Sequence, residues 1–188
     1  MSISIKSIDE AVLFFIQGHM KSPALDGIMF FITSLGNAGL FWIVLAVTFI
    51  IQKRCQKWGI SLICTISLSR FLGDDLLKPL FGRLRPCNRF PDIELLIQRP
   101  SSPSFPSGHT MVAFAAAMML YYFNKRLGVA CFVLAFLIAF SRLYLFVHYP
   151  TDILGGILFG VLSSKLLYDG LTCIYKNIEN GVTLPPNS

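Results

Sequence analysis

Long apolar runs separated by short polar segments make up most of the chain after residue 23. An apolar stretch of about 20 residues can cross the hydrocarbon core of a bilayer as a helix. The pattern predicts five such spans, over residues 24–52, 58–77, 109–124, 127–147 and 153–174. The sequence Gly36-Asn37-Ala38-Gly39 interrupts the first span. We therefore expect a tilt or kink there, or a half-buried segment followed by a span.

Residues 1–23 follow a different pattern, which predicts an interfacial amphipathic helix that can also supply a sixth span. Its apolar face consists of Ile5, Ile8, Val12, Phe15 and Ile16. The apolar run at 11–16 is too short for the core of a signal peptide, so we expect no removable signal. The polar residues 177–188, with two prolines, predict a flexible tail.

Composition supports a membrane protein, because 54% of the 188 residues are hydrophobic and only 14% are charged. A soluble domain carries about a quarter charged residues. The fold class is therefore expected to be all-α, a polytopic transmembrane helical bundle that forms one domain over 1–188. The net charge of +6 does not indicate nucleic acid, because the cations lie in short loops between apolar runs. The five cysteines form no metal-ligand pattern, and no obligate protein partner is evident.

The basic loops predict the orientation of the chain. With alternating spans, three groups of cations fall on one side, which the positive-inside rule makes the cytoplasm. These groups are Lys53, Arg54 and Lys57, then Lys125 and Arg126, then Lys165 and Lys176. The loop 78–109 is also basic and taken alone favours the inverted protein, but we assign its cations to substrate binding. The site is thus expected on the extracytoplasmic face of the cell membrane.

Three polar strings interrupt the apolar pattern, and the alternation of spans brings all of them to this face. They are Lys78–Pro86, Pro106–His109, and Ser141-Arg142 followed by His148 and Asp152. Cations beside apolar spans are costly, so their presence there indicates function.

The first two strings contain the parts of a phosphate site. Pro79 is expected to end the span near Lys78, whose ammonium would act with the planar fork of Arg85 as a phosphate clamp. Ser107 is a natural N-cap, and Gly108 lets the backbone approach a ligand closely. Free N–H groups at this helix start would receive a phosphate oxygen. His109 would point at the same anion. The alternatives are a positively charged helix flank, ordinary capping and a polar histidine at the rim.

The third string predicts a nucleophile. Arg142 is expected about two turns deep in a span, where an arginine needs an anion or a carboxylate. Asp152 is close enough to accept the imidazole N–H of His148, which prepares the other ring nitrogen for attack. The alternative is a capping aspartate that follows a chance histidine.

Other features predict structure. Arg70 and Asp74 can form an ion pair, and Asp75 can steady Lys78. Small residues recur every fourth position in the last span and favour close packing against a neighbour. They are Gly156, Gly160 and Ser164.

With these residues the chain resembles the type 2 phosphatidic acid phosphatase superfamily. The family signature is Lys, six residues, Arg-Pro; then Pro-Ser-Gly-His; then Ser-Arg, five residues, His, three residues, Asp, and every spacing matches. The resemblance implies that His148 attacks phosphorus and becomes phosphohistidine, Asp152 orients it, and His109 protonates the leaving oxygen and then activates water. It also implies that phosphate is held by Lys78, Arg85, Ser107, Gly108 and Arg142. No metal or other cofactor is required, because these cations neutralise the charge.

The predicted function is that of an integral-membrane lipid phosphatase or diphosphatase. Undecaprenyl diphosphate is the preferred substrate, and phosphatidylglycerol phosphate, phosphatidate and lipid A 1-phosphate are alternatives. The extra cations Arg83, Arg89 and Arg99 are candidates for binding a second phosphate. A lipid-phosphate or anion transporter is the alternative from another class. A vanadate-dependent haloperoxidase is disfavoured because the motifs lie on membrane spans.

Overall fold

The computed structural model describes residues 5–182, with side chains described for 5–174, and this part of the chain is helical without strands. The prediction of an all-α fold is therefore confirmed. The longer helices are α1 (Ile5–His19), α2 (Pro23–Gly36), α3 (Leu40–Ile51), α4 (Gln56–Arg70), α7 (Gly108–Phe123), α8 (Lys125–Tyr144) and α9 (Pro150–Val182). Two short helices, α5 (Lys78–Phe81) and α6 (Pro86–Arg89), flank the start of the connection to α7. The remaining turns are 3-10 at Asn37–Gly39 and Lys53–Cys55, and a π-helical segment at Phe71–Leu77.

Among the described residues, three helical segments are long and apolar enough to cross a membrane. They are Pro23–Ile51, Lys125–Tyr144 and Pro150–Ile174, which agree with three of the predicted spans. The predicted span 109–124 is the shorter apolar helix α7, and the predicted span 58–77 is α4 with the π-helical segment that follows it. The count of five spans, and the possible sixth, stay predictions.

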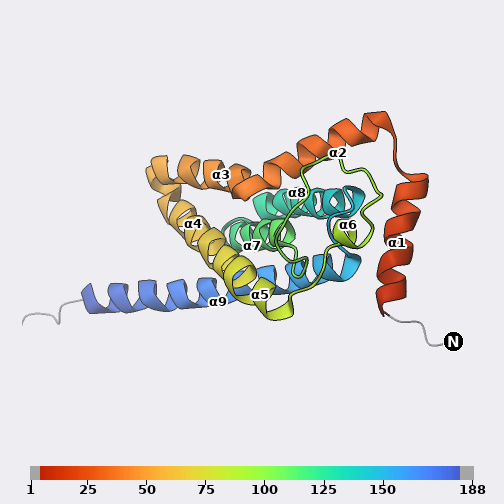
Figure 1. The fold of residues 1–188 in the computed structure, drawn as a ribbon. Coiled ribbons are helices and arrows are strands. Elements are labelled where there is room, and N and C mark those ends of the chain that lie inside the picture. The colour runs from red at the N-terminus through yellow and green to blue at the C-terminus, as the bar shows by residue number, and fades with distance from the viewer. Residues whose placement is uncertain (1–4, 183–188) are drawn as a thin grey trace, which may run out of the picture.

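Helix α7 lies at the centre of the bundle, between α8, α9 and α4 (Figure 1). Nearly its whole circumference is buried, as expected of a helix that is apolar all round. The small residues of α9 make this packing possible: a Cβ at Gly156 would lie 2.9 Å from the carbonyl oxygen of Ser107, and one at Gly160 would lie 2.4 Å from that of Met111. The predicted close-packing face of the last span is therefore confirmed.

A kink separates α2 from α3, as the interruption at 36–39 predicted. Ala38 and Gly39 have φ values of 53° and 72°, in the left-handed region that favours glycine. The helix direction changes here, and Asn37 is brought next to His109. The break in the apolar pattern therefore has a role in the site.

Two predicted helix ends were wrong. Pro79 does not stop the helix near Lys78: α5 continues to Phe81 and ends at Gly82, which has φ 54°. The π-helical segment before Lys78 shifts the backbone hydrogen bonding, so the missing N–H of Pro79 falls in the first turn of α5, where it is tolerated. Helix α8 ends at Tyr144 rather than at 147, so Arg142 lies in its last turn and not two turns deep.

Helix α1 lies across the end of the bundle where α8 ends and α9 begins (Figure 1). Its predicted apolar face is largely exposed at Ile5, Ile8 and Phe15, whereas Ile16 is buried. This exposure is consistent with the predicted interfacial helix. At the other terminus, α9 continues through Val182, and the rest of the predicted flexible tail, 183–188, lies outside the described residues.

Candidate active site

The three polar strings meet at one cavity of about 610 Å³. Its wall includes Lys78, Arg85, Gly108, His109, Arg142 and His148. Of the remaining predicted site residues, Ser107 and Asp152 are fully buried and support this wall without lining it. The structure thus brings residues from α5, the loop 82–107, α7, α8 and the α8–α9 loop to one place.

His148 lies in the loop between α8 and α9 and is 1% exposed. Its Nε2 is 3.0 Å from Nη1 of Arg85, and its Nδ1 is 3.5 Å from Oδ2 of Asp152. Because a guanidinium group only donates, Nε2 is the acceptor and the neutral ring carries its proton on Nδ1. Burial lowers the pKa of His148 to about 3, although the hydrogen bond to Asp152 opposes this effect. The ring is therefore neutral, and the lone pair of Nε2 accepts from Arg85.

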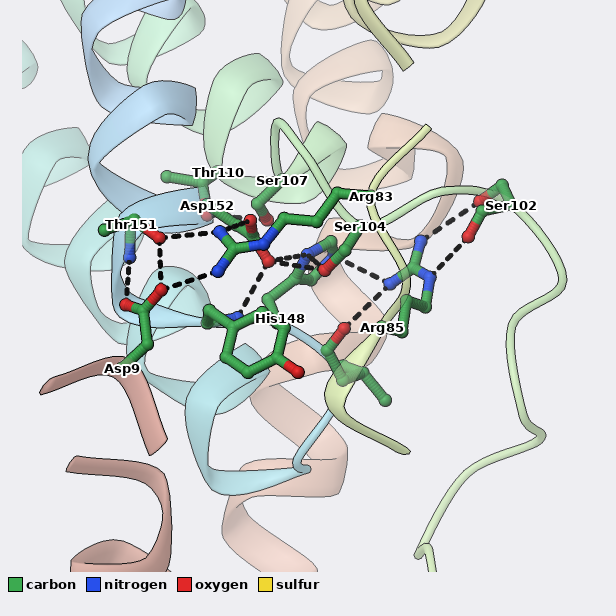
Figure 2. A network of polar contacts seen from close by, with 12 residues as sticks. Asp9, Arg83, Arg85, Ser102, Ser104, Ser107, Thr110, His148, Thr151 and Asp152 are labelled. Carbon is green, nitrogen blue, oxygen red and sulfur yellow. Dashed lines mark hydrogen bonds and ion pairs between the residues drawn. The ribbon is translucent and has the colours of Figure 1, made fainter. Parts of the chain in front are cut away.

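Asp152 is held by donors on both of its oxygens (Figure 2). Oδ2 accepts from the backbone N–H of Tyr149 at 2.8 Å and from the hydroxyl of Ser104, and Oδ1 accepts from Nη1 of Arg83 at 2.7 Å. These contacts fix the carboxylate beside His148. Our sequence reasoning missed Ser104, because no spacing rule links it to a helix 48 residues later.

Arg85 is bonded along its whole guanidinium group. Nε donates to the carbonyl of Ser102 at 2.7 Å, Nη2 donates to the Ser102 hydroxyl at 3.0 Å, and Nη1 donates to the carbonyl of Val147 at 3.0 Å as well as to His148. Burial lowers the pKa of Arg85, but a guanidinium group stays protonated in proteins. The predicted clamp residue is thus in direct contact with the nucleophile, and it would have to exchange this bond for a phosphate oxygen.

Lys78 and Arg142 supply the other two cations. Nζ of Lys78 donates to Oδ1 of Asp74 at 2.6 Å, and Nη1 of Arg142 donates to the hydroxyl of Thr33 at 2.6 Å. Arg142 is only 4% exposed, and its buried Nε has no hydrogen-bond partner among the described residues. A buried N–H group without a partner costs free energy, more so when it is charged. Arg142 therefore combines a place in the cavity wall with a donor that has no partner in the described part of the chain.

The expected pairs of Arg70 with Asp74 and of Asp75 with Lys78 are wrong. Asp74 is four residues from both cations and pairs with the buried Lys78, for which the lack of a partner would be more costly. Arg70 instead donates from Nη1 to the carbonyl of Ala38 at 3.0 Å and lines the cavity.

His109 lies in the first turn of α7, and its Nε2 is 2.9 Å from Oδ1 of Asn37. This amide oxygen only accepts, so Nε2 of His109 carries a proton. A Cβ at Gly36 would lie 2.8 Å from Cδ2 of His109, so the glycine allows α2 to approach this closely. Asn37 was not among the predicted site residues, although the interruption at 36–39 was the signal that marked it.

The start of α7 differs from the expectation in one respect. Ser107 occupies the N-cap position, but its hydroxyl does not cap the helix and instead accepts from Thr110 at 2.9 Å. The backbone N–H of Ser107 donates to the carbonyl of Asp152 at 3.1 Å, so it is already used. Gly108 lines the cavity, and a Cβ there would lie 3.2 Å from Oδ1 of Asp74.

The extra arginines of loop 82–107 do not line the cavity. Arg83 binds Asp9 and Asp152, Arg89 lies 3.2 Å from Glu10, and Arg99 donates to the backbone carbonyls of Cys87 and Pro91. The expectation that they meet a second phosphate was therefore wrong, since each is already used to hold the loop.

The comparisons with known proteins agree with this geometry. Residues 58–172 match the sequence model of the PAP2 superfamily. An undecaprenyl-diphosphatase of Sulfolobus acidocaldarius is 31% identical over 149 residues, which are 79% of this chain and 71% of the relative.

Two solved structures have a similar fold. The crystal structure of a transmembrane PAP2 type phosphatidylglycerolphosphate phosphatase from Bacillus subtilis has a TM-score of 0.74 and 28% identity, covering 97% of this chain and 89% of that one. The crystal structure of Aquifex aeolicus LpxE has a TM-score of 0.76 and 29% identity, covering 90% of this chain and 99% of that one. The chain therefore belongs to the PAP2 superfamily of type 2 phosphatidic acid phosphatases, and is a membrane protein and a hydrolase of phosphate esters.

Proposed function

We propose that this protein removes phosphate from a lipid phosphate or diphosphate through a phosphohistidine intermediate on His148. The observation that carries the proposal is that Arg142, whose buried Nε has no partner among the described residues, lines the same cavity as His148 and His109. A cation with an unused donor beside a neutral nucleophile suits a phosphoryl group, whose oxygens accept hydrogen bonds and carry negative charge.

The first step transfers the phosphoryl group to the enzyme. Nε2 of His148 forms a bond to phosphorus while the bond from phosphorus to the leaving oxygen breaks. His109, in its protonated form, donates the Nε2 proton to that oxygen. The imidazole of His148 gains positive charge, which the carboxylate of Asp152 stabilises through Nδ1–H.

The second step releases phosphate. His109, now neutral, accepts a proton from water while the water oxygen bonds to phosphorus. The nitrogen–phosphorus bond breaks, its electron pair returns to Nε2 of His148, and inorganic phosphate leaves. Lys78, Arg85 and Arg142 stabilise the charge on the phosphoryl oxygens in both steps.

A lipid substrate is supported by the apolar part of the same cavity wall. Phe30 of α2 and the loop residues Leu95, Leu96 and Ile97 line it together with the cations. The Phe30 side chain is 53% exposed, so the apolar wall reaches the outside of the bundle. A lipid can place its head group among the cations while its chain leaves along these residues.

Undecaprenyl diphosphate is the proposed substrate. The relative from Sulfolobus acidocaldarius carries that activity in its name, and Arg70 lines the cavity in addition to the three cations assigned to the transferred phosphate. Arg70 is therefore the candidate for the second phosphate, in place of the arginines of loop 82–107. Phosphatidylglycerol phosphate, phosphatidate and lipid A 1-phosphate remain the competing substrates.

We propose that the site faces the extracytoplasmic side. The connections that carry Lys53 and Arg54, and Lys125 and Arg126, lie at the bundle end away from the site (Figure 1). Labelling single cysteines introduced at Arg126 and at Asp92 with a membrane-impermeant reagent on intact cells tests this orientation. Labelling at Arg126 and not at Asp92 would contradict it.

The chemistry is tested with His148→Ala and with His19→Ala as the matched control, because His19 is exposed on α1 and away from the cavity. His148→Ala is expected to lose activity by at least about 10⁴-fold, and His19→Ala to keep it. Acid-stable adducts are not expected, so the intermediate is sought as base-stable phosphohistidine after rapid quenching. Lipid uptake into vesicles without phosphate release would favour the transporter instead.

The substrate is tested by comparing kcat/KM of the purified enzyme for the four lipids. We expect undecaprenyl diphosphate to be preferred. Arg70→Gln should then lower kcat/KM for the diphosphate more than for undecaprenyl phosphate. A preference for a glycerophospholipid monophosphate, or equal losses on both polyprenyl substrates, would overturn the choice of substrate while leaving the chemistry intact.

A further inference from the structure

Helix α1 carries a carboxylate that is completely buried, although most of the helix surface is apolar and exposed. Asp9 is 0% exposed, and its oxygens accept from the backbone N–H of Thr151 at 3.0 Å, from the Thr151 hydroxyl at 2.6 Å and from Nη2 of Arg83 at 2.6 Å. Burying a carboxylate is costly unless it is paired and hydrogen-bonded. The three hydrogen bonds, one of them from a cation, compensate for the burial of this carboxylate.

Arg83 links Asp9 to the active site (Figure 2). While Nη2 donates to Asp9, Nη1 donates to Oδ1 of Asp152 at 2.7 Å, and the guanidinium lies 4.2 Å from the ring centre of Tyr149. Burial alone would lower the pKa of Arg83, but the hydrogen bond to Asp9 and the charges of both carboxylates raise it above its usual value. Arg83 does not line the cavity, so its charge acts on Asp152 and not on the substrate.

The charges of this group explain why two carboxylates are present. Arg83 and Asp152 alone would form a neutral ion pair, and Asp152 would stabilise positive charge on His148 only weakly. With Asp9 on the far side of the guanidinium, the three groups carry a net charge of −1. His148 lies 3.5 Å from Asp152 in a buried site. The change in net charge from zero to −1 therefore acts strongly on the imidazole of His148.

We propose that Asp9 and Arg83 are positioning residues that set the charge and orientation of Asp152, and through it the nucleophilicity of His148. The role rests on the proposed function, in which His148 attacks phosphorus. It gives the N-terminal helix a direct part in the site, although α1 precedes the matched family region.

The chain contains a matched control one residue away. Glu10 lies beside Asp9 on α1 and contacts Arg89 of the same loop at 3.2 Å, but this pair touches neither Asp152 nor His148. Glu10→Gln therefore weakens the docking of α1 on the loop without changing the charge at Asp152. Asp9→Asn is nearly isosteric. It removes the charge and also replaces one accepting oxygen by an NH2 donor, which faces a donor of Thr151 or Arg83.

The experiment compares Asp9→Asn, Arg83→Gln, the double variant and Glu10→Gln in two assays. In the first, Asp9→Asn should lower kcat about tenfold with little change in KM, and Glu10→Gln should leave both unchanged. Arg83→Gln should lower kcat by a smaller factor in the Asp9→Asn background than in the wild type. The reason is that Arg83→Gln alone leaves two buried carboxylates without their cation.

The second assay measures acylation of His148 by diethyl pyrocarbonate with mass spectrometry, with the exposed His19 as internal reference. It needs no lipid, so it decides the inference even if the proposed substrates are not hydrolysed. Reduced nucleophilicity predicts slower acylation of His148 in Asp9→Asn, whereas a loosened site predicts faster acylation. Faster or unchanged acylation in Asp9→Asn, or equal effects in Glu10→Gln, would overturn the proposal.

Discussion

The two halves of the cavity are built in opposite ways. In the nucleophile half, His148, Asp152 and Arg85 are buried, and their polar atoms are bonded to several different segments of the chain. In the acid half, His109, Lys78 and Arg142 line the cavity, and the side chain of each hydrogen-bonds to one other side chain among the described residues. The nucleophile half, called the fixed half below, is held in place before substrate arrives. The acid half, called the open half below, keeps donors for the charge that the substrate brings.

This difference follows from what each half has to do. A nucleophile reacts efficiently only when it is held in the correct geometry, and a loop can provide this only if it is tied to its neighbours. The cations stabilise charge that develops during the reaction, so donors already saturated by the protein would contribute little. Arg85 belongs to both halves, because it lines the cavity and also binds Nε2 of His148.

Removing the charge of the fixed half should have the largest effect. Asp152→Asn keeps the shape of the side chain but removes the carboxylate that supports imidazolium, so we expect kcat to fall about 10³- to 10⁴-fold with KM little changed. Steady-state kinetics on the purified variant test this. Asp169→Asn, an exposed position on the same helix, is the control. An unaltered kcat would remove Asp152 from the mechanism.

Removing one cation of the open half should lower activity less than removing the carboxylate of Asp152. Arg142→Met removes the cation with the unpartnered Nε, and we expect kcat/KM to fall about 10²- to 10³-fold. Unlike the loss of Asp152, this change should raise KM as well, because Arg142 would contact the phosphate in the ground state. The control is Arg126→Met, at the exposed start of α8. A normal KM with a reduced kcat would place Arg142 with the fixed half instead.

The sequence predicted the six residues of both halves, but not the partners that hold them in place. Lys78, His109 and Arg142 are recognisable because polar residues at the ends of apolar runs are unusual, and the alternation of spans was enough to bring them together. The partners that fix His148 lie in the loop 82–107 and on α1, where polar residues are common. Ser104, Arg83 and Asp9 acquire their roles only from the path of the loop, and no periodicity in the sequence describes that path.

The helix ends were hard to predict for a related reason. The rule that proline stops a helix assumes regular α-helical bonding before it, and the π-helical segment at Phe71–Leu77 changes that bonding. By contrast, the interruption at Gly36–Gly39 predicted a tilt, a kink or a half-buried segment, and the structure has a kink there. What the pattern did not indicate is that the kink supports His109.

That support is expected to have a modest effect. Asn37→Ala removes the acceptor for Nε2 of His109, so the ring can turn away from the leaving oxygen, and we expect kcat to fall about tenfold. Ser34→Ala is the matched control, because Ser34 lines the same cavity and its hydroxyl donates to the carbonyl of Phe31 and not to His109. If both variants lower kcat equally, the kink acts through its shape and not through the contact with His109.

The last prediction concerns the pH dependence of stability and not kcat, and it belongs to the fixed half. Burial lowers the pKa of His148 to about 3 in the folded protein, against about 6.5 in an unfolded chain. Between these values the unfolded chain binds more protons, so the free energy of unfolding falls as the pH is lowered from 6.5 towards 3. His148→Gln removes this titration and should reduce the slope. Apparent melting temperatures in detergent at pH 7, 6, 5 and 4, followed by tryptophan fluorescence, compare the two proteins. Parallel curves would mean that His148 is not buried as a neutral ring, and that the two halves of the cavity differ less than the structure indicates.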